Sequence, residues 1–230
     1  MRRRRPHDYR ALFLTGRWFA GLPDDLQGQL LDAAAVRAVA AGEVVVARGG
    51  EPGGLYGVVD GAIRIAGRDG GRDVFHMLIE PPSWFGELSA IDGQPVHQAS
   101  VAEVDGALVC VARPALDRLL EREPRWWQHL ARLVAHRLRL ALLALEDSAQ
   151  APPRIRLARR LAMLVAGYGD HTLARRTVAL RQEQLAQMLG LSRQTANGAL
   201  KDLEARGLIK VAYGEVEILD AAGLRALCGL

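Results

Sequence analysis

Residues 180–209 read LRQEQLAQMLGLSRQTANGALKDLEARGLI, which predicts a helix, a tight turn and a second helix. Apolar side chains, Leu185 and Leu189 among them, recur at helical spacing along one face of the first helix. Gly190 can adopt the left-handed conformation that ends a helix, and Ser192 can cap the next helix by accepting a backbone hydrogen bond. The segment is therefore typical of a helix-turn-helix unit.

The second of these helices exposes polar side chains near its start and buries Ala196 and Leu200 on the other face. Arg and Gln can form paired hydrogen bonds with guanine and adenine edges in a major groove. Polar side chains on the first turns of a second helix are typical of a DNA recognition helix. We therefore expect Arg193, Gln194 and Asn197 to read bases, the alternative being an ordinary surface hairpin of helices.

Side chains suited to phosphate contacts surround the expected reading face. They are Arg181, Gln182, Ser192, Thr195 and Lys201. The runs 209–212 and 215–219 flank Tyr213 and Gly214, a pattern that predicts a β-hairpin. The reading unit is therefore expected to be of the winged type, with Tyr213 and Gly214 touching the DNA backbone.

Further toward the N-terminus the chain becomes rich in glycine. Twelve of its 24 glycines lie between Gly42 and Gly93, interleaved with short β-branched runs that continue at 101–104 and 108–111. Such spacing predicts an antiparallel sandwich or barrel over about residues 42–113. The preceding residues, 11–41, are expected to be helical.

A continuous apolar stripe follows Pro124 and predicts a long helix that ends before Pro152. The stripe consists of Leu130, Val134, Leu138, Ala141 and Leu145. A stripe of this length must be buried, and a second copy of the chain is the expected partner. The alternative is packing against the chain's own β-domain.

Together these segments predict an α+β protein in four parts. The parts are a basic tail at 1–10, a sensor β-roll of the double-stranded β-helix (jelly-roll) type at 11–123, a dimerisation helix and hinge at 124–150, and a winged helix-turn-helix domain at 151–230. The last part carries 12 Lys and Arg against 7 Asp and Glu, whereas the whole chain has a net charge of +4. A basic C-terminal third suits a polyanionic partner.

Composition also argues against several classes of protein. The two cysteines lie far apart without metal-ligand spacing, so neither a metal site nor an iron–sulfur cluster is expected. We expect the protein to function in a reducing compartment. The apolar runs fall short of the roughly 20 residues of a membrane span, so we expect a cytoplasmic protein with no membrane partner. Without a Ser-His-Asp pattern, a P-loop lysine or an acidic metal cluster, an enzyme is not expected.

The order of parts, with FGELS at 85–89, IDGQP at 91–95 and SRQT at 192–195, resembles the Crp/Fnr family of bacterial transcription regulators. The resemblance implies a homodimer that places one recognition helix per subunit in successive major grooves of a palindromic site, about 34–36 Å apart. It also implies a contact with RNA polymerase, for which the loop 168–176 is the candidate.

The same resemblance implies an effector pocket formed by Gly86, Glu87, Leu88, Ser89, His97, Gln98, Ala141 and Leu142. In members that bind cyclic nucleotides, the Glu takes a ribose hydroxyl, and about ten residues later an Arg pairs with the phosphate. Here that position holds Val96 or His97, and Ala141 and Leu142 replace the adjacent hydroxyls that reach adenine. Cyclic AMP bound in the usual way is therefore not expected.

The effector itself stays open, including the possibility that there is none. His76, His97, His129 and His136 are candidate haem ligands by residue type alone, and haem is not expected. An alternative function is a ligand-sensing module whose winged domain binds a protein partner instead of DNA. Salt dependence would separate the two, since DNA binding through phosphates weakens steeply with salt.

Overall fold

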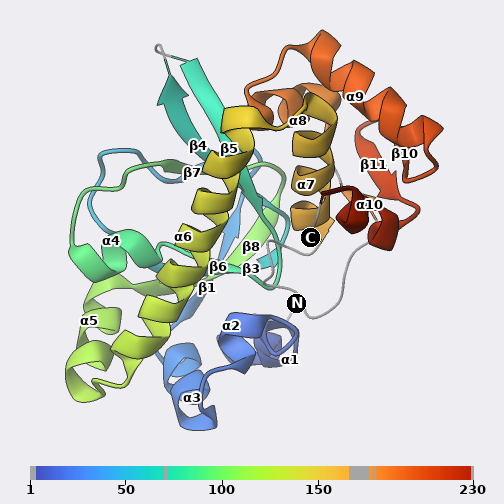
Figure 1. Ribbon diagram of the computed structural model, residues 1–230. Coiled ribbons are helices and arrows are strands. Elements are labelled where there is room, and N and C mark those ends of the chain that lie inside the picture. The colour runs from blue at the N-terminus through green and yellow to red at the C-terminus, as the bar shows by residue number, and fades with distance from the viewer. Residues whose placement is uncertain (1–3, 70–71, 166–176, 179, 229–230) are drawn as a thin grey trace.

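The computed structural model describes residues 4–69, 72–165, 177–178 and 180–228 (Figure 1). Within these ranges the side chains of 68–69, 72–76 and 143–150 are outside the description. Two four-stranded antiparallel sheets form the N-terminal roll, in the orders β1-β8-β3-β6 and β2-β7-β4-β5. Their strands are β1 (Ala35–Val39), β2 (Val44–Val46), β3 (Gly54–Asp60), β4 (Ile63–Asp69), β5 (Arg72–Ile79), β6 (Trp84–Phe85), β7 (Ala99–Ala102) and β8 (Gly106–Ala112).

Apolar side chains cover both faces of the β1-β8-β3-β6 sheet, which explains the continuous apolar run of β8. Leu108 points between the two sheets, where it packs with Ile63 and Phe85. Val109 and Val111 pack on the other face, against the helical layer at the base of the roll. Strands buried on both faces show such runs instead of an alternation of apolar and polar residues.

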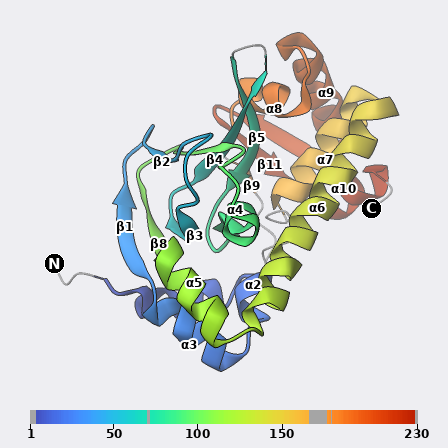
Figure 2. The ribbon, with the colours of Figure 1, turned by 90° about the vertical axis from the view of Figure 1, so that its left-hand side faces the viewer.

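Helices close the base of the roll and one side of it (Figure 2). They are η1 (Pro6–Tyr9), α1 (Arg10–Phe13), α2 (Arg17–Ala20), α3 (Asp24–Asp32), α4 (Glu87–Asp92) and α5 (Arg113–Arg122). Phe13, Phe19 and Trp84 form a buried aromatic group at this base, with ring centroids 4.6 to 6.0 Å apart. The long helix α6 (Trp126–Gln150) begins beside this group and leaves the roll diagonally.

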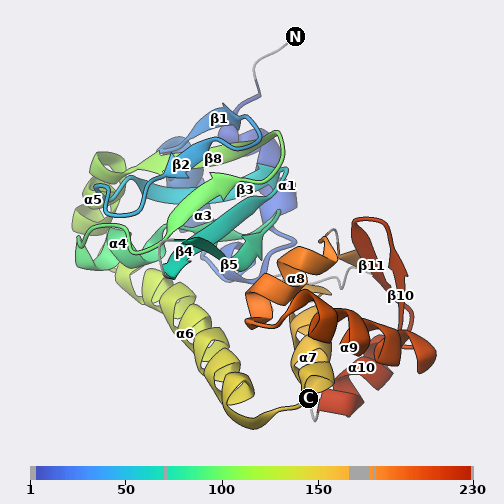
Figure 3. The same cartoon turned by 90° about the horizontal axis from the view of Figure 1, so that it is seen from above.

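The C-terminal part is a second compact unit beyond the far end of α6 (Figure 3). It consists of α7 (Pro153–Val165), β9 (Thr177–Val178), α8 (Gln182–Leu189), α9 (Arg193–Ala205), β10 (Ile209–Ala212), β11 (Glu215–Ile218) and α10 (Ala221–Cys228). The three strands form an antiparallel sheet in the order β10-β11-β9. Helix α8 contacts β5, and Leu78 of the roll joins the apolar core of this unit.

The fold confirms the α+β class, the roll, the long helix and the helix-turn-helix with its hairpin, but it corrects two local predictions. Residues 11–41 are not one helical region, because α1, α2 and α3 are separate and residues 35–39 form strand β1. Backbone pairing of β1 with β8 outweighs the helix propensity of this alanine-rich run. The strand expected at 101–104 lies at 99–102, and Val104 is 48% exposed beyond its end.

Candidate nucleic-acid interface and ligand cavity

The turn between α8 and α9 is built as its residues predict. Gly190 has a φ of 59°, the left-handed conformation in which a side chain would be strained. The Ser192 hydroxyl accepts a hydrogen bond of 3.1 Å from the backbone N–H of Thr195 and lies 2.8 Å from that residue's Oγ1. Leu191 N–H donates to the carbonyl of Ala186 at 2.9 Å, which closes the turn. The start of α9 is thereby fixed relative to α8.

Two arginines of α7 contact the C-terminal end of α8. The Arg156 guanidinium donates to the carbonyl of Leu189, and Nη2 of Arg160 lies 3.5 Å from the carbonyl of Met188. Cations at a helix C-terminus satisfy its last carbonyls and interact favourably with the helix dipole. Sequence reasoning missed both residues, although their spacing of four places them on one face of this amphipathic helix.

The expected base-reading residues share the outer face of the first two turns of α9. Arg193 and Gln194 are exposed, and Asn197, one turn later, is half-buried. Arg181, Ser192, Thr195 and Lys201 are also exposed, and Gln182 is half-buried at the start of α8. Most of the expected reading and phosphate-contacting side chains are therefore accessible to a partner.

The wing is joined to the C-terminal part of α9. The Glu204 carboxylate accepts a hydrogen bond of 2.9 Å from the backbone N–H of Val211 in β10. Tyr213, at the tip of the hairpin between β10 and β11, is fully exposed, and Gly214 follows it with a φ of 77°. A large aromatic residue held out in solvent is available to a partner.

Part of the apolar stripe of α6 is buried against the roll, and part of it is exposed to solvent. Leu130 is completely buried with Trp126 and Leu133 in the core at the base of the roll, so it has no surface to offer a partner. Leu138 and Leu142, by contrast, are 57% and 49% exposed. Val134 is half-buried, Ala141 is exposed, and the side chain of Leu145 is outside the described part of the chain.

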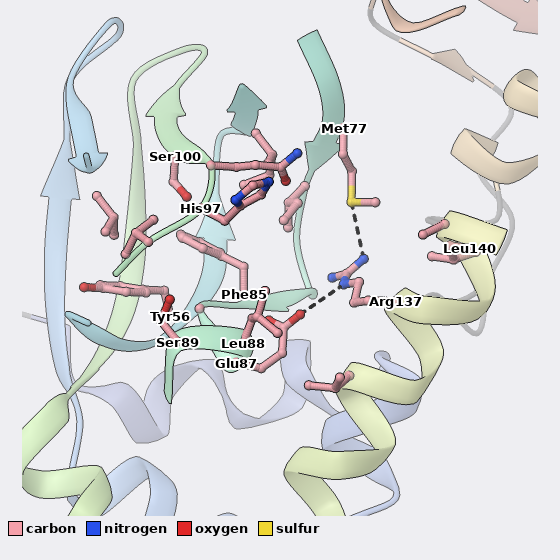
Figure 4. A pocket seen from close by; sticks show the side chains of 18 of the residues that line it. Tyr56, Met77, Phe85, Glu87, Leu88, Ser89, His97, Ser100, Arg137 and Leu140 are labelled. Atoms are coloured by element: carbon pink, nitrogen blue, oxygen red, sulfur yellow. Dashed lines mark hydrogen bonds and ion pairs between the residues drawn. The ribbon is translucent and has the colours of Figure 1, made fainter. Parts of the chain in front are cut away.

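A cavity of about 920 Å³ lies between the roll, α6 and the C-terminal unit (Figure 4). All but one of the residues expected in an effector pocket line it: Gly86, Glu87, Leu88, Ser89, His97, Gln98 and Ala141. Leu142 is not among the lining residues that the structure describes. Residues of α7 and α8, which sequence reasoning did not place here, complete the wall: Arg156, Arg160, Met163, Met188 and Leu189.

Gly86 aims the Glu87 side chain into this cavity. Its φ is 95°, and a Cβ at this position would collide with the carbonyl oxygen of Gly54. Only glycine fits such a turn without strain. Helix α4 begins directly after this turn, at Glu87, which is only 8% exposed.

The partner of Glu87 is Arg137 of α6, which sequence reasoning also missed. Nε of Arg137 lies 3.9 Å from Oε1 of Glu87 (Figure 4). Nη2 of Arg137 donates to the carbonyl of Trp84 at 3.0 Å. The Arg137 side chain is 14% exposed. A buried carboxylate needs such a cation. The available signal was a charge three residues from Val134 and four from Ala141, within the apolar stripe.

Among the described residues of the roll that line the cavity, none carries a guanidinium that could pair with a cyclic phosphate. Val96 is held by two backbone hydrogen bonds, from its N–H to Gly50 at 3.0 Å and from the N–H of Gly49 to its carbonyl at 2.7 Å. The next residue that lines the cavity is His97, and the lining residues that the roll contributes within the described ranges include no Lys or Arg. Burial, followed by the effect of Cys110, raises the pKa of Tyr56, so this hydroxyl stays neutral at neutral pH. These residues do not fit a cyclic nucleotide bound through a roll arginine.

The described residues contain no group of three or more His, Cys, Asp or Glu side chains arranged to hold a metal ion. His129, a candidate by residue type, is 5% exposed and lies edge-on to Trp126 with ring centroids 6.5 Å apart. Among the helices of the described part of the chain, none combines the length and the apolar character needed to cross a membrane.

Comparison with known proteins agrees with this architecture. Residues 36–123 match the cyclic nucleotide-binding domain, and residues 155–227 match the Crp-like helix-turn-helix domain. A CRP-like cAMP-activated global transcriptional regulator of Mycobacterium tuberculosis is 33% identical over 179 residues, which is 76% of this chain and 80% of the relative. The cyclic AMP receptor protein of Thermus thermophilus is 31% identical over 175 residues, covering 75% of this chain and 78% of the relative.

Solved structures share the fold. The catabolite activator protein of Thermus thermophilus is 28% identical with a TM-score of 0.51, and the match covers 92% of this chain and 98% of that one. FixK2 from Bradyrhizobium japonicum is 21% identical with a TM-score of 0.72, covering 84% and 96%. The chain therefore belongs to the Crp/Fnr family of DNA-binding transcription regulators.

Proposed function

We propose that this protein is a homodimeric regulator that binds a palindromic operator and responds to a small molecule in its cavity. The observation that carries the proposal is the surface of α9, where Arg193 and Gln194 are exposed on a capped first turn. The hairpin that follows α9 adds a fully exposed Tyr213. In this proposal Arg193 pairs with a guanine through O6 and N7, and Gln194 with an adenine. Arg181, Thr195 and Lys201 set the register on the phosphates.

The exposed leucines of α6 support the dimer. Leu138 and Leu142 are exposed apolar side chains on a helix that packs on the roll through Leu130 and on the C-terminal unit through Leu140. Pairing with the same residues of a second copy would bury both leucines. A twofold axis along α6 would then present two copies of α9. Recognition helices related in this way read half-sites one helical turn apart, about 34–36 Å.

The cavity supports a role for an effector, because both the roll and the C-terminal unit line it. A ligand there shifts the protein between orientations of the C-terminal unit only through different affinity for each orientation. The relatives from Mycobacterium and Thermus are named for cyclic AMP. In this chain Val96 or His97 stands at the position of the phosphate-binding arginine, so we propose a different effector. RNA polymerase remains a proposed partner, and its candidate contact at 168–176 lies outside the described residues.

Selection from random duplex DNA with purified, ligand-free protein at near-physiological salt tests the function. An enriched palindrome with one guanine per half-site is the expected result, and binding to it should fall steeply with salt. Adding cell extract as a source of effector extends the selection to a form in which the C-terminal unit is reoriented. If neither condition enriches a sequence, the proposal fails in favour of a winged domain that binds a protein partner.

A further inference from the structure

The cavity between the roll, α6 and the C-terminal unit has a chemistry that identifies a class of ligand. We infer that it binds a largely apolar organic molecule that carries an acidic group, such as a long-chain or aromatic carboxylate, and not a cyclic nucleotide. The inference rests on the proposed function to the extent that this molecule is taken as the effector. The binding itself is a separate property of the cavity.

Methionines mark the apolar part of the site. The chain has four methionines, and three of them, Met77, Met163 and Met188, line this cavity, while the fourth is Met1. The three come from β5, α7 and α8, elements far apart in the sequence. Methionine side chains are flexible and polarisable, and they are frequent on surfaces that adapt to apolar ligands. Their concentration at one site indicates an apolar ligand body.

The position of these methionines also indicates that the ligand bridges two units. Met77 packs against the interior of the roll and against the core of the C-terminal unit. Met163 belongs to α7, which supports the helix-turn-helix, and Met188 belongs to α8, the first helix of that unit. A molecule that contacts all three therefore touches the roll and the DNA-binding unit at once.

The remaining walls favour the same kind of molecule. Phe85, Leu88 and Leu140 add apolar surface, and the volume of about 920 Å³ is at the upper end of the roughly 300–1,000 Å³ usual for small-molecule sites. Removing apolar area from water contributes roughly 25 cal/mol per Å². A cyclic nucleotide has little apolar surface with which to use these walls.

Charge identifies the polar end. The Lys, Arg, Asp and Glu side chains that line the cavity within the described ranges are Arg137, Arg156, Arg160 and Glu87, an excess of two positive charges. Glu87 faces Arg137 across 3.9 Å, and the two other arginines lie together at the end of α8. A carboxylate is favoured near these two arginines, because opposite charges attract strongly in a region of low dielectric constant.

Three probes test the inference on the full-length protein. They are 1-anilinonaphthalene-8-sulfonate as an apolar anion, N-phenyl-1-naphthylamine as a similar neutral molecule, and cyclic AMP as a polar anion. We expect the first to bind more tightly than the second, dodecanoate below its micellar concentration to displace both, and cyclic AMP to displace neither. Methyl NMR of ¹³C-labelled methionine should show that dodecanoate shifts the signals of Met77, Met163 and Met188.

A pair of variants on α7 tests the charge. Arg160→Met should weaken binding of the anionic probe about tenfold or more and leave the neutral probe unchanged, because it removes a charge-assisted contact. Arg159→Met is the matched control. Arg159 lies one residue away, bonds to the carbonyl of Cys228, and is not among the residues that line the cavity. The control should leave both probes unchanged.

Several results would overturn the inference. They are displacement of the probes by cyclic AMP, no shift of the three methionine signals with dodecanoate, or equal weakening of both probes by Arg160→Met. If Arg160→Met does not fold, the NMR and competition measurements on the unaltered protein still decide. A protein that selects an operator but binds no apolar anion disproves this inference alone, whereas one that binds dodecanoate but no DNA disproves the proposed function alone.

Discussion

Gln184, on the first helix of the helix-turn-helix, donates a hydrogen bond of 2.6 Å from Nε2 to Oε1 of Glu103 in the roll. The other carboxylate oxygen of Glu103 accepts from Nε of Arg64 at 3.1 Å. The Gln184 Oε1 atom accepts from the backbone N–H of Arg181 at 2.8 Å, which caps α8. One amide side chain therefore both starts α8 and joins it to the sensor, so it helps to set the orientation of α9 relative to α6.

Changing Gln184→Glu should loosen this contact without harming α8. A carboxylate keeps the acceptor that caps the helix, and negative charge is favourable at a helix N-terminus. It cannot donate to Glu103, however, and it places two carboxylates side by side. Since hydrogen bonds to charged groups contribute roughly 1.5–3 kcal/mol, hydrogen exchange of the α8 amides should accelerate about tenfold.

Gln187→Glu provides the matched control, because it makes the same change at an exposed position of the same helix. Exchange measured by mass spectrometry should separate the two variants. Equal rates in both would mean that the Glu103 contact does not hold the two units together.

Arg193→Ala should reduce affinity for the selected operator by about 1–3 kcal/mol and relax the preference at one base pair of each half-site. The reason is that a guanidinium can pair with a guanine through two hydrogen bonds at once. Arg206→Ala, at the far end of α9 where Arg206 is bonded to Asp202 at 3.2 Å, is the control. Fluorescence anisotropy on operators varied one base pair at a time would measure both. Uniform weakening on all sequences would identify Arg193 as a phosphate contact instead.

Leu138→Glu should separate the dimer. In one protomer Leu138 is 57% exposed, so the charge is tolerated there, but in the proposed interface it would be buried without a partner. The dimer dissociation constant is expected to rise about 100-fold, or roughly 2.7 kcal/mol. Arg132→Glu adds the same side chain at an exposed position elsewhere on α6. Sedimentation equilibrium should find Leu138→Glu monomeric and Arg132→Glu dimeric. If both variants remain dimeric, the interface does not include Leu138.

The local sequence was sufficient for the parts that depend on short-range patterns. Gly190 and Ser192 predicted the turn of the helix-turn-helix because their conformation and capping roles are local. The glycine-rich runs predicted the strands of the roll for the same reason. Strand β1 was missed because the alanine-rich run around Ala35 favours a helix locally, whereas the pairing of β1 with β8 is a contact across more than 70 residues.

The cavity shows where such reasoning stops. The motif at 86–89 predicted one wall, yet the opposite walls come from Arg137, Met163 and Met188, whose proximity depends on how α6, α7 and α8 pack. The link between Glu103 and Gln184 spans 81 residues and has no sequence signature. Contacts between the two units depend on how the units pack together, so they are found only in the structure.

We expect the buried side chain of His129 to make the protein less stable in mild acid. Its side chain is 5% exposed on α6, and in the described part of the chain its Nε2 has no hydrogen-bond partner. Burial, followed by repulsion from Arg132 and Arg125, lowers the pKa of His129 below its ordinary value of 6.5. As the pH falls through about 6.5, His129 therefore binds a proton in the unfolded chain before it does so in the folded protein. The contribution of neutral His129 to the free energy of unfolding should be fully present above that pH and should decrease as the pH falls toward the lowered pKa.

A change of His129→Phe should flatten this pH dependence, because phenylalanine does not titrate and is tolerated beside Trp126 in an apolar setting. His7→Gln is the control, since His7 is an exposed histidine outside the core, where its ring lies 2.8 Å from Asp32. Urea unfolding at pH 5.5 and pH 7.5 should give a smaller difference in the free energy of unfolding for His129→Phe than for the unaltered protein or the control. If all three lose the same stability between these pH values, the acid sensitivity arises from carboxylates and not from the buried imidazole.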